Sequence, residues 1–103
     1  MNNHFTIFNV ILSIFYENKR NIFNDELILI LKEKGYDAFI LSSFDDIKKS
    51  IKDNDVLLDP DTIEDYFYVE NGKLLHSYMK DEEKCWERLI NFSPSDVLIV
   101  RNK

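Results

Sequence analysis

The first third of the chain carries apolar residues at helical spacing. Polar positions recur every three or four residues over 3–17 and leave a wide apolar face, which predicts a helix. A second helix is expected to begin at Asn24 as its N-cap and to end at Gly35, the usual left-handed residue after a helix. Its centre, Leu27–Leu31, is apolar on every side and would also fit a buried strand. The caps and the length favour a buried helix.

Two further helices and three short strands follow from caps and short apolar runs. Ser43 is a good N-cap, with Asp46 three residues later in a capping-box arrangement, and predicts a third helix. Acids at 81–83 open a last helix, which we expect 93–95 to stop. Short strands are expected at three apolar runs that flank these helices. These runs are Ala38–Leu41, Val56–Leu58 and Val97–Val100.

The Asn71-Gly72 pair is the clearest local signal in the chain. This pair favours a two-residue type I′ hairpin turn, in which both central residues take positive φ. The turn sets the register of the strands on either side of it, which are Tyr66–Glu70 and Lys73–Met79. The predicted pairs are Glu70 with Lys73, Val69 with Leu74, Tyr68 with Leu75 and Phe67 with His76. Neither face of this hairpin is plainly polar, so we expect one face to cover the core and the other to be covered by a helix or by a partner.

The predicted elements define a fold class. Their order is α-α-β-α-β-β-β-α-β, with the hairpin at Asn71-Gly72 in its centre. This order predicts an α+β (mixed α/β) fold, with a mixed sheet and helices on one or both of its faces. Because 103 residues suit one core, we expect residues 1–103 to form a single globular domain.

The composition argues against catalysis and against bound cofactors. With two glycines, no glycine-rich phosphate loop can be built. Cys85 is the single cysteine and falls on the apolar face of a predicted helix, where a buried structural thiol is expected. His76 is expected to be a packed or surface residue, because no second metal ligand lies three or four residues away. We therefore expect neither an enzyme, nor a metal site, nor a cofactor.

The N-terminal apolar run favours a cytoplasmic protein. No Lys or Arg precedes it, Asn9 and Ser13 interrupt it, and no small-residue cleavage site follows, so it does not fit a signal peptide. It is also shorter than the roughly 20 apolar residues that cross a membrane. One cysteine without a disulfide partner fits a reducing compartment.

The negative charge is unevenly distributed. The net charge is −6, and residues 1–52 contribute none of it, with seven acids against seven bases. Residues 53–103 hold twelve acids and six bases, so the whole excess lies there. Such a half repels a nucleic-acid backbone and attracts a basic protein.

The acids before the hairpin are the candidate site. One interpretation is a solvated acidic loop, and another is a divalent-metal site, although the loop lacks the regular alternation and closing Glu of a calcium loop. A third is an interface, because acids next to aromatic residues are typical of protein-binding surfaces. The residues predicted to bind a partner are Asp59, Asp61, Glu64, Asp65, Tyr66 and Tyr68.

These features favour a small acidic protein that neutralises a basic macromolecular partner. The leading hypothesis is an immunity protein that inhibits a bacterial nuclease-type toxin, since such a toxin has a basic groove for its polyanionic substrate. Two alternatives stay open: a phage-encoded inhibitor of a nucleic-acid-binding defence complex, and a divalent-metal-dependent enzyme subunit. We expect no nucleic-acid or membrane partner, and the sequence leaves open whether the protein is a monomer or a homodimer.

Overall fold

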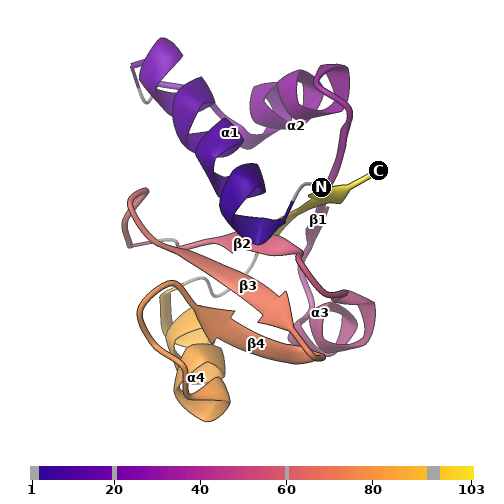
Figure 1. The fold of residues 1–103 in the computed structure, drawn as a ribbon, viewed down its shortest axis with the longest axis vertical. Helices are drawn as coiled ribbons and strands as arrows, with labels where there is room; N and C mark the ends of the chain where they lie inside the picture. Colours follow the sequence, from indigo (N-terminus) through magenta and orange to yellow (C-terminus); the bar gives the residue numbers. More distant parts are fainter. Residues whose placement is uncertain (1–2, 20, 60, 93–95) are drawn as a thin grey trace.

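The order of helices and strands matches the order predicted from the sequence. A computed structural model describes residues 3–19, 21–59, 61–92 and 96–103, and Figure 1 shows its fold. The predicted helix stop at 93–95 lies outside the described residues. The four helices are α1 (His4–Glu17), α2 (Asn24–Glu33), α3 (Phe44–Ser50) and α4 (Glu82–Phe92). The five strands are β1 (Tyr36–Leu41), β2 (Val56–Leu58), β3 (Tyr66–Glu70), β4 (Lys73–His76) and β5 (Val97–Asn102).

The strands form one five-stranded sheet in the order β1-β5-β2-β3-β4. Each described pair of neighbours is antiparallel, so the expectation of a mixed sheet is wrong. The reason is the position of β5, which enters between β1 and β2 and runs antiparallel to both. The α+β class is confirmed.

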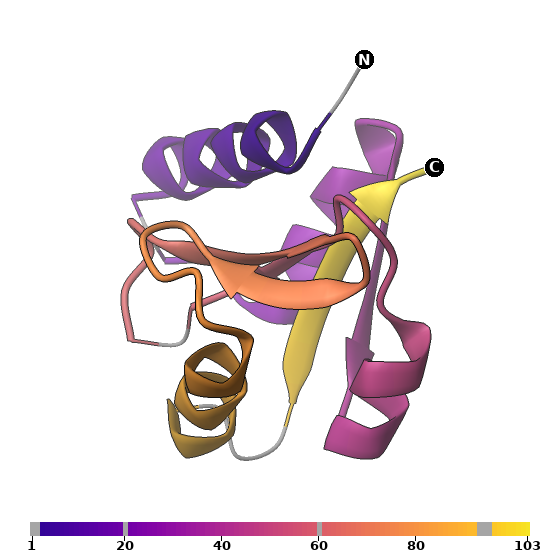
Figure 2. The same ribbon diagram turned by 60° about the horizontal axis from the view of Figure 1, so that its bottom comes forward.

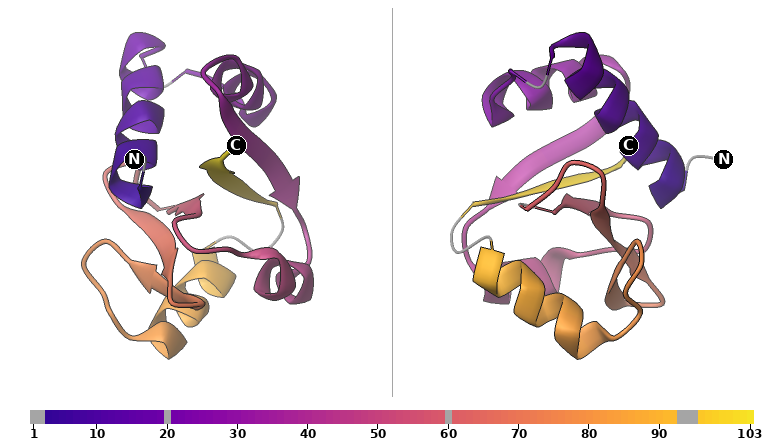
Figure 3. Two further views of the ribbon diagram at one scale, coloured as in Figure 1. Left: turned by 45° about the vertical axis from the view of Figure 1, so that its right-hand side comes forward. Right: turned by 90° about the vertical axis from the view of Figure 1, so that its left-hand side faces the viewer.

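Helices cover both faces of the sheet (Figures 2 and 3). α1 and α2 pack on one face, and α3 and α4 pack on the other. The strands are therefore apolar on both sides, as Val97–Val100 of β5 shows, with four consecutive buried residues. The second face of the hairpin is thus covered by a helix, one of the two possibilities that the sequence left open.

The hairpin forms with the predicted register. Glu70 pairs with Lys73, and the three following pairs are those expected from the turn. Asn71 and Gly72 both have positive φ, 54° and 76°, as a type I′ turn requires. The carboxylate of Asp53 accepts a hydrogen bond of 2.9 Å from the Gly72 N–H and ties the turn to the segment before β2.

The helix starts agree with the sequence in two cases and differ in one. The side chains of Asn3 and Ser43 cap α1 and α3. In α2, however, Asn24 is already helical and Phe23 occupies the N-cap without a side-chain hydrogen bond. The predicted burial of α2 on all sides is also wrong, because the helix meets the sheet with one side only and leaves Leu29 63% exposed.

Three strand boundaries also shift, and one of them is the end of β5, which continues to Asn102, two residues beyond the predicted end. β1 begins at Tyr36, two residues before the predicted start. β4 ends at His76 rather than Met79, because the chain turns back there and Met79 pairs with His76 in an isolated bridge.

Truncation of a core leucine tests the two-sided burial. Leu57 is fully buried in the layer between the sheet, α3 and α4, so Leu57→Ala should lower the free energy of unfolding by about 2–5 kcal/mol. The matched variant Leu29→Ala removes the same atoms from an exposed position and should change it by less than about 0.5 kcal/mol. Urea denaturation measures both, and similar losses in the two variants would contradict this packing.

Candidate functional site

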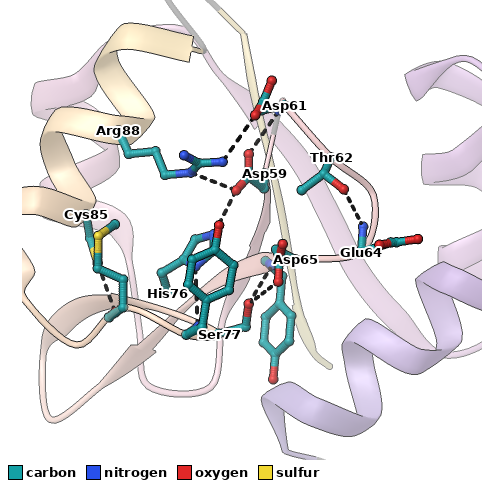
Figure 4. A network of polar contacts seen from close by, with 12 residues as sticks. Asp59, Asp61, Thr62, Glu64, Asp65, His76, Ser77, Cys85 and Arg88 are labelled. Carbon is teal, nitrogen blue, oxygen red and sulfur yellow. Dashed lines mark hydrogen bonds and ion pairs between the residues drawn. The ribbon is translucent and has the colours of Figure 1, made fainter.

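The loop of residues 59–65 joins β2 to β3 and contains four of the predicted site residues. We call it the acidic loop, and Figure 4 shows its polar contacts. It lies between the start of the β3–β4 hairpin and α4. Its first residue, Asp59, directly follows β2 and is fully buried at its side chain.

Asp59 is the centre of a buried network. The ring Nε2–H of His76 donates to the Asp59 carboxylate at 2.7 Å, and the Arg88 Nε–H donates to the same oxygen at 2.9 Å. The other carboxylate oxygen accepts from the backbone N–H of Asp61 at 2.9 Å. The network joins the acidic loop, β4 and α4 at one carboxylate (Figure 4).

The hydrogen bonds of the network orient the His76 ring and shift the pKa values of Asp59 and Arg88. The His76 Nδ1 accepts from the backbone N–H of Tyr78 at 3.4 Å, so the ring directs its Nε2–H toward Asp59. Burial alone would raise the pKa of Asp59, but the hydrogen bonds from Arg88, Asp61 and His76 outweigh it and lower that pKa. The same ion pair raises the pKa of Arg88. Asp59 is therefore an ionised structural anchor and is not available at the surface.

The other three acids of the loop differ in exposure. The side chain of Asp61 is 58% exposed, although one oxygen lies 3.4 Å from Arg88 Nη2. Glu64 is exposed and its backbone N–H donates to Thr62 Oγ1 at 3.1 Å. Asp65 is half-buried and accepts a hydrogen bond of 3.0 Å from Ser77 Oγ. Asp61 and Glu64 are thus the acids that the loop presents to solvent.

Tyr66 and Tyr68 do not present their rings at the surface. Both are buried between β3 and α1, where His4 stacks on Tyr68 at a centroid distance of 3.9 Å. The His4 Nδ1 lies 3.0 Å from the Tyr66 hydroxyl, and burial lowers the pKa of His4 and raises that of Tyr66. The Tyr68 hydroxyl accepts from Lys80 Nζ. Their predicted role as surface anchors is corrected, because the alternation along β3 directs both rings into the core beneath α1.

A second buried acid repeats the pattern of Asp59. Asp55 accepts hydrogen bonds of 2.8 Å from the Lys52 backbone N–H and from Arg101 Nη2. Burial raises its pKa, and Arg101 opposes that shift. The remaining oxygen, Asp55 Oδ1, and the Arg101 Nε have no hydrogen-bond partner among the described residues. Asp55 and Asp59 therefore both face inward, and each pairs with an arginine.

Sequence reasoning missed three members of the site. The sequence predicts His76 to be a packed or surface residue, and it is a packed one, but its role at the site was missed, as were those of Arg88 and Tyr78. Tyr78 is 66% exposed and packs its ring edge-on against His76 at 4.6 Å. Because His76 hydrogen-bonds to Asp59, this contact places Tyr78 next to the residue that anchors the acidic loop. The alternation of the hairpin, which placed His76 opposite Phe67, was the available signal for its burial.

Within the described chain, no group of three or more His, Cys, Asp or Glu side chains is arranged to hold a metal ion. Cys85 is buried, its thiol donates to the Met79 carbonyl at 3.4 Å, and burial raises its pKa to about 11. Such a thiol is the opposite of an activated nucleophile.

Comparison with known proteins gives no relative for this chain. No protein-family model, curated protein or solved structure matches it. Among the described residues, none of the helices has the length and apolar character needed to cross a membrane. The functional argument therefore depends on the geometry of the site itself.

Truncating Asp59 tests the network as an anchor. Asp59→Ala leaves His76 and Arg88 without their shared acceptor and should lower the free energy of unfolding by about 3–5 kcal/mol. Asp61→Ala removes an exposed carboxylate and should cost less than about 1 kcal/mol. Thermal or urea denaturation gives both values, and a small loss in Asp59→Ala would show that the network contributes little.

The lowered pKa of Asp59 predicts a pH dependence with a definite sign. Because the folded state holds this carboxylate ionised, its contribution is fully present above the unfolded pKa of about 3.9. The contribution is lost as the pH falls through the lower folded pKa. The stability difference between the wild type and Asp59→Asn should therefore be largest near neutral pH and shrink below about pH 4. Urea unfolding from pH 7 to pH 3 measures it, and a difference that does not change with pH contradicts the assignment.

Proposed function

We propose that this protein binds and neutralises a basic macromolecular partner through the acidic loop and its surroundings. The best fit is an inhibitor, or immunity protein, of a basic nuclease-type toxin in the cytoplasm. The observation that carries the proposal is that the acidic loop is held by a buried network while Asp61 and Glu64 stay exposed on it.

The charge distribution supports a basic partner. The acidic loop belongs to residues 53–103, which carry the whole net charge of −6. Further acids are exposed nearby in sequence, on the hairpin turn and along α4. These exposed acids are Glu70, Asp81, Glu82, Glu83 and Glu87. The exposed Lys73, Lys80 and Lys84 lie among them, so the charge there is negative on balance. A net negative surface accelerates the association of a positively charged protein.

The buried network supports tight binding. A loop that is already fixed loses little conformational entropy when a partner binds, so more of the interaction energy appears as affinity. The Asp59 carboxylate fixes the start of the loop by accepting from the Asp61 backbone N–H. The Asp65–Ser77 hydrogen bond fixes the other end of the loop against the hairpin. The backbone that carries the exposed carboxylates is therefore fixed before the partner arrives.

Tyr78 supplies the aromatic contact that Tyr66 and Tyr68 cannot. It is exposed, lies beside the acidic loop, and is held against the buried His76 ring. An aromatic residue surrounded by charged groups is the composition of an interface hot spot. The proposed binding surface is thus Asp61, Glu64 and Tyr78.

Charge reversal tests the proposal. The partner to test first is the product of the gene immediately upstream, since immunity genes adjoin their toxin genes. Asp61→Lys with Glu64→Lys should weaken its binding at least tenfold, because two attractions become repulsions, and the inhibition of its nuclease activity should fall in parallel. Thermal stability should change little, because both side chains are exposed.

The matched control carries the same charge change elsewhere. Glu17→Lys with Glu33→Lys replaces two exposed acids of α1 and α2 and alters the net charge equally. This variant should bind nearly as the wild type does. Equal weakening in both double variants would assign the effect to net charge alone, and no binding of the wild type to any basic protein would refute the proposal.

A further inference from the structure

The two edge strands of the sheet, β4 and β1, differ in how their outer backbone groups are protected. At the β4 edge, the chain folds back on itself, and His76 and Met79 exchange backbone hydrogen bonds of 2.9 and 3.2 Å. Lys80 adds a side-chain hydrogen bond of 2.9 Å to the His76 carbonyl. This edge therefore has part of its backbone satisfied and a charged side chain beside it, two devices that discourage pairing with another strand.

The β1 edge has no such protection. β1 is the outermost strand on the other side of the sheet and lies between α2 and α3 (Figure 3). Within the described part of the chain, the backbone of residues 37–41 forms hydrogen bonds to no segment except β5. Six residues long, β1 contains no proline or lysine, and Asp37 is its only charged residue. Phe39, Ile40 and Leu41 are only half-buried. A long apolar edge of this kind is a template for a further strand.

We propose that the outer edge of β1 pairs antiparallel with β1 of a second copy of this chain. The pairing would join two five-stranded sheets into one continuous sheet. It would satisfy the outward N–H and C=O groups of both edge strands and cover the half-buried Phe39, Ile40 and Leu41.

The charges point to a second copy as the occupant. β1 belongs to residues 1–52, which carry no net charge, whereas the excess of −6 lies in residues 53–103. The sheet order places the hairpin, into which the acidic loop leads, at the end opposite β1. Two copies that meet at β1 therefore bring neutral regions together and keep the acidic loops apart.

The strand sequence is compatible with two-fold pairing. In an antiparallel pair centred on Phe39, Asp37 of each copy lies opposite Leu41 of the other, so the two aspartates do not face each other. Ala38 lies opposite Ile40, a small residue against a larger one. Such a two-fold arrangement is the commonest symmetry of protein dimers.

The test is the oligomeric state of the full chain and of two lysine variants. Light scattering after size exclusion, over micromolar to millimolar concentrations, should show a monomer–dimer equilibrium for the wild type. Ile40→Lys places a charge on the β1 edge and should shift the midpoint at least tenfold upward in concentration. Leu75→Lys is the matched control, because Leu75 is also half-buried, sits on the other edge strand and packs against the same core layer. It should dimerise as the wild type does.

Hydrogen exchange of the wild type keeps the test independent of how the variants fold. Amides of residues 37–41 should become more protected as the concentration rises, with no such change in β4. A monomer at all concentrations would overturn the proposal. So would a dimer that Ile40→Lys and Leu75→Lys weaken equally while both fold, or concentration-dependent protection located elsewhere.

Discussion

The structure depends on the insertion of β5 between β1 and β2. This strand hydrogen-bonds to both neighbours, and Val97–Val100 are buried from both sides of the sheet. Without it, β1 would have no sheet partner, and β2, β3 and β4 would form a separate small sheet. The strand also connects segments far apart in sequence, since Ala38 pairs with Val100. Pairings of such long sequence separation close large loops and slow folding.

Burial of both sheet faces explains the position of the acidic loop. Because α4 covers the face on which Asp59 and His76 lie, these two side chains have no route to solvent. A polar side chain at these points must find a partner inside the protein. Asp59, His76 and Arg88 solve this requirement together, and the loop that follows Asp59 is fixed as a result.

The sequence predicted the elements well and the site only in part. The register of the hairpin followed from Asn71-Gly72, because a two-residue turn at this pair allows only one pairing of the strands on either side. The acidic loop was also found, since its charges are adjacent in sequence. Which acids face inward was not predictable, because Arg88 and Arg101 lie 29 and 46 residues from Asp59 and Asp55. The burial of Tyr66 and Tyr68 depends on α1, which covers the face of the sheet on which both rings lie. Because both faces of the hairpin are apolar in the sequence, the pattern did not show which face a helix would cover.

The two helical layers each contain their own natural optical reporter. Trp86, the single tryptophan, lies on α4 with the Lys48 ammonium of α3 5.2 Å from its ring centre. On the opposite face, His4 stacks on Tyr68 and Phe8 stacks on Tyr66. Tryptophan emission therefore follows the α3–α4 side, while the near-ultraviolet tyrosine signal receives a contribution from the α1 side. If the two signals change together on unfolding, the two layers unfold as one cooperative unit, because both pack on the same sheet.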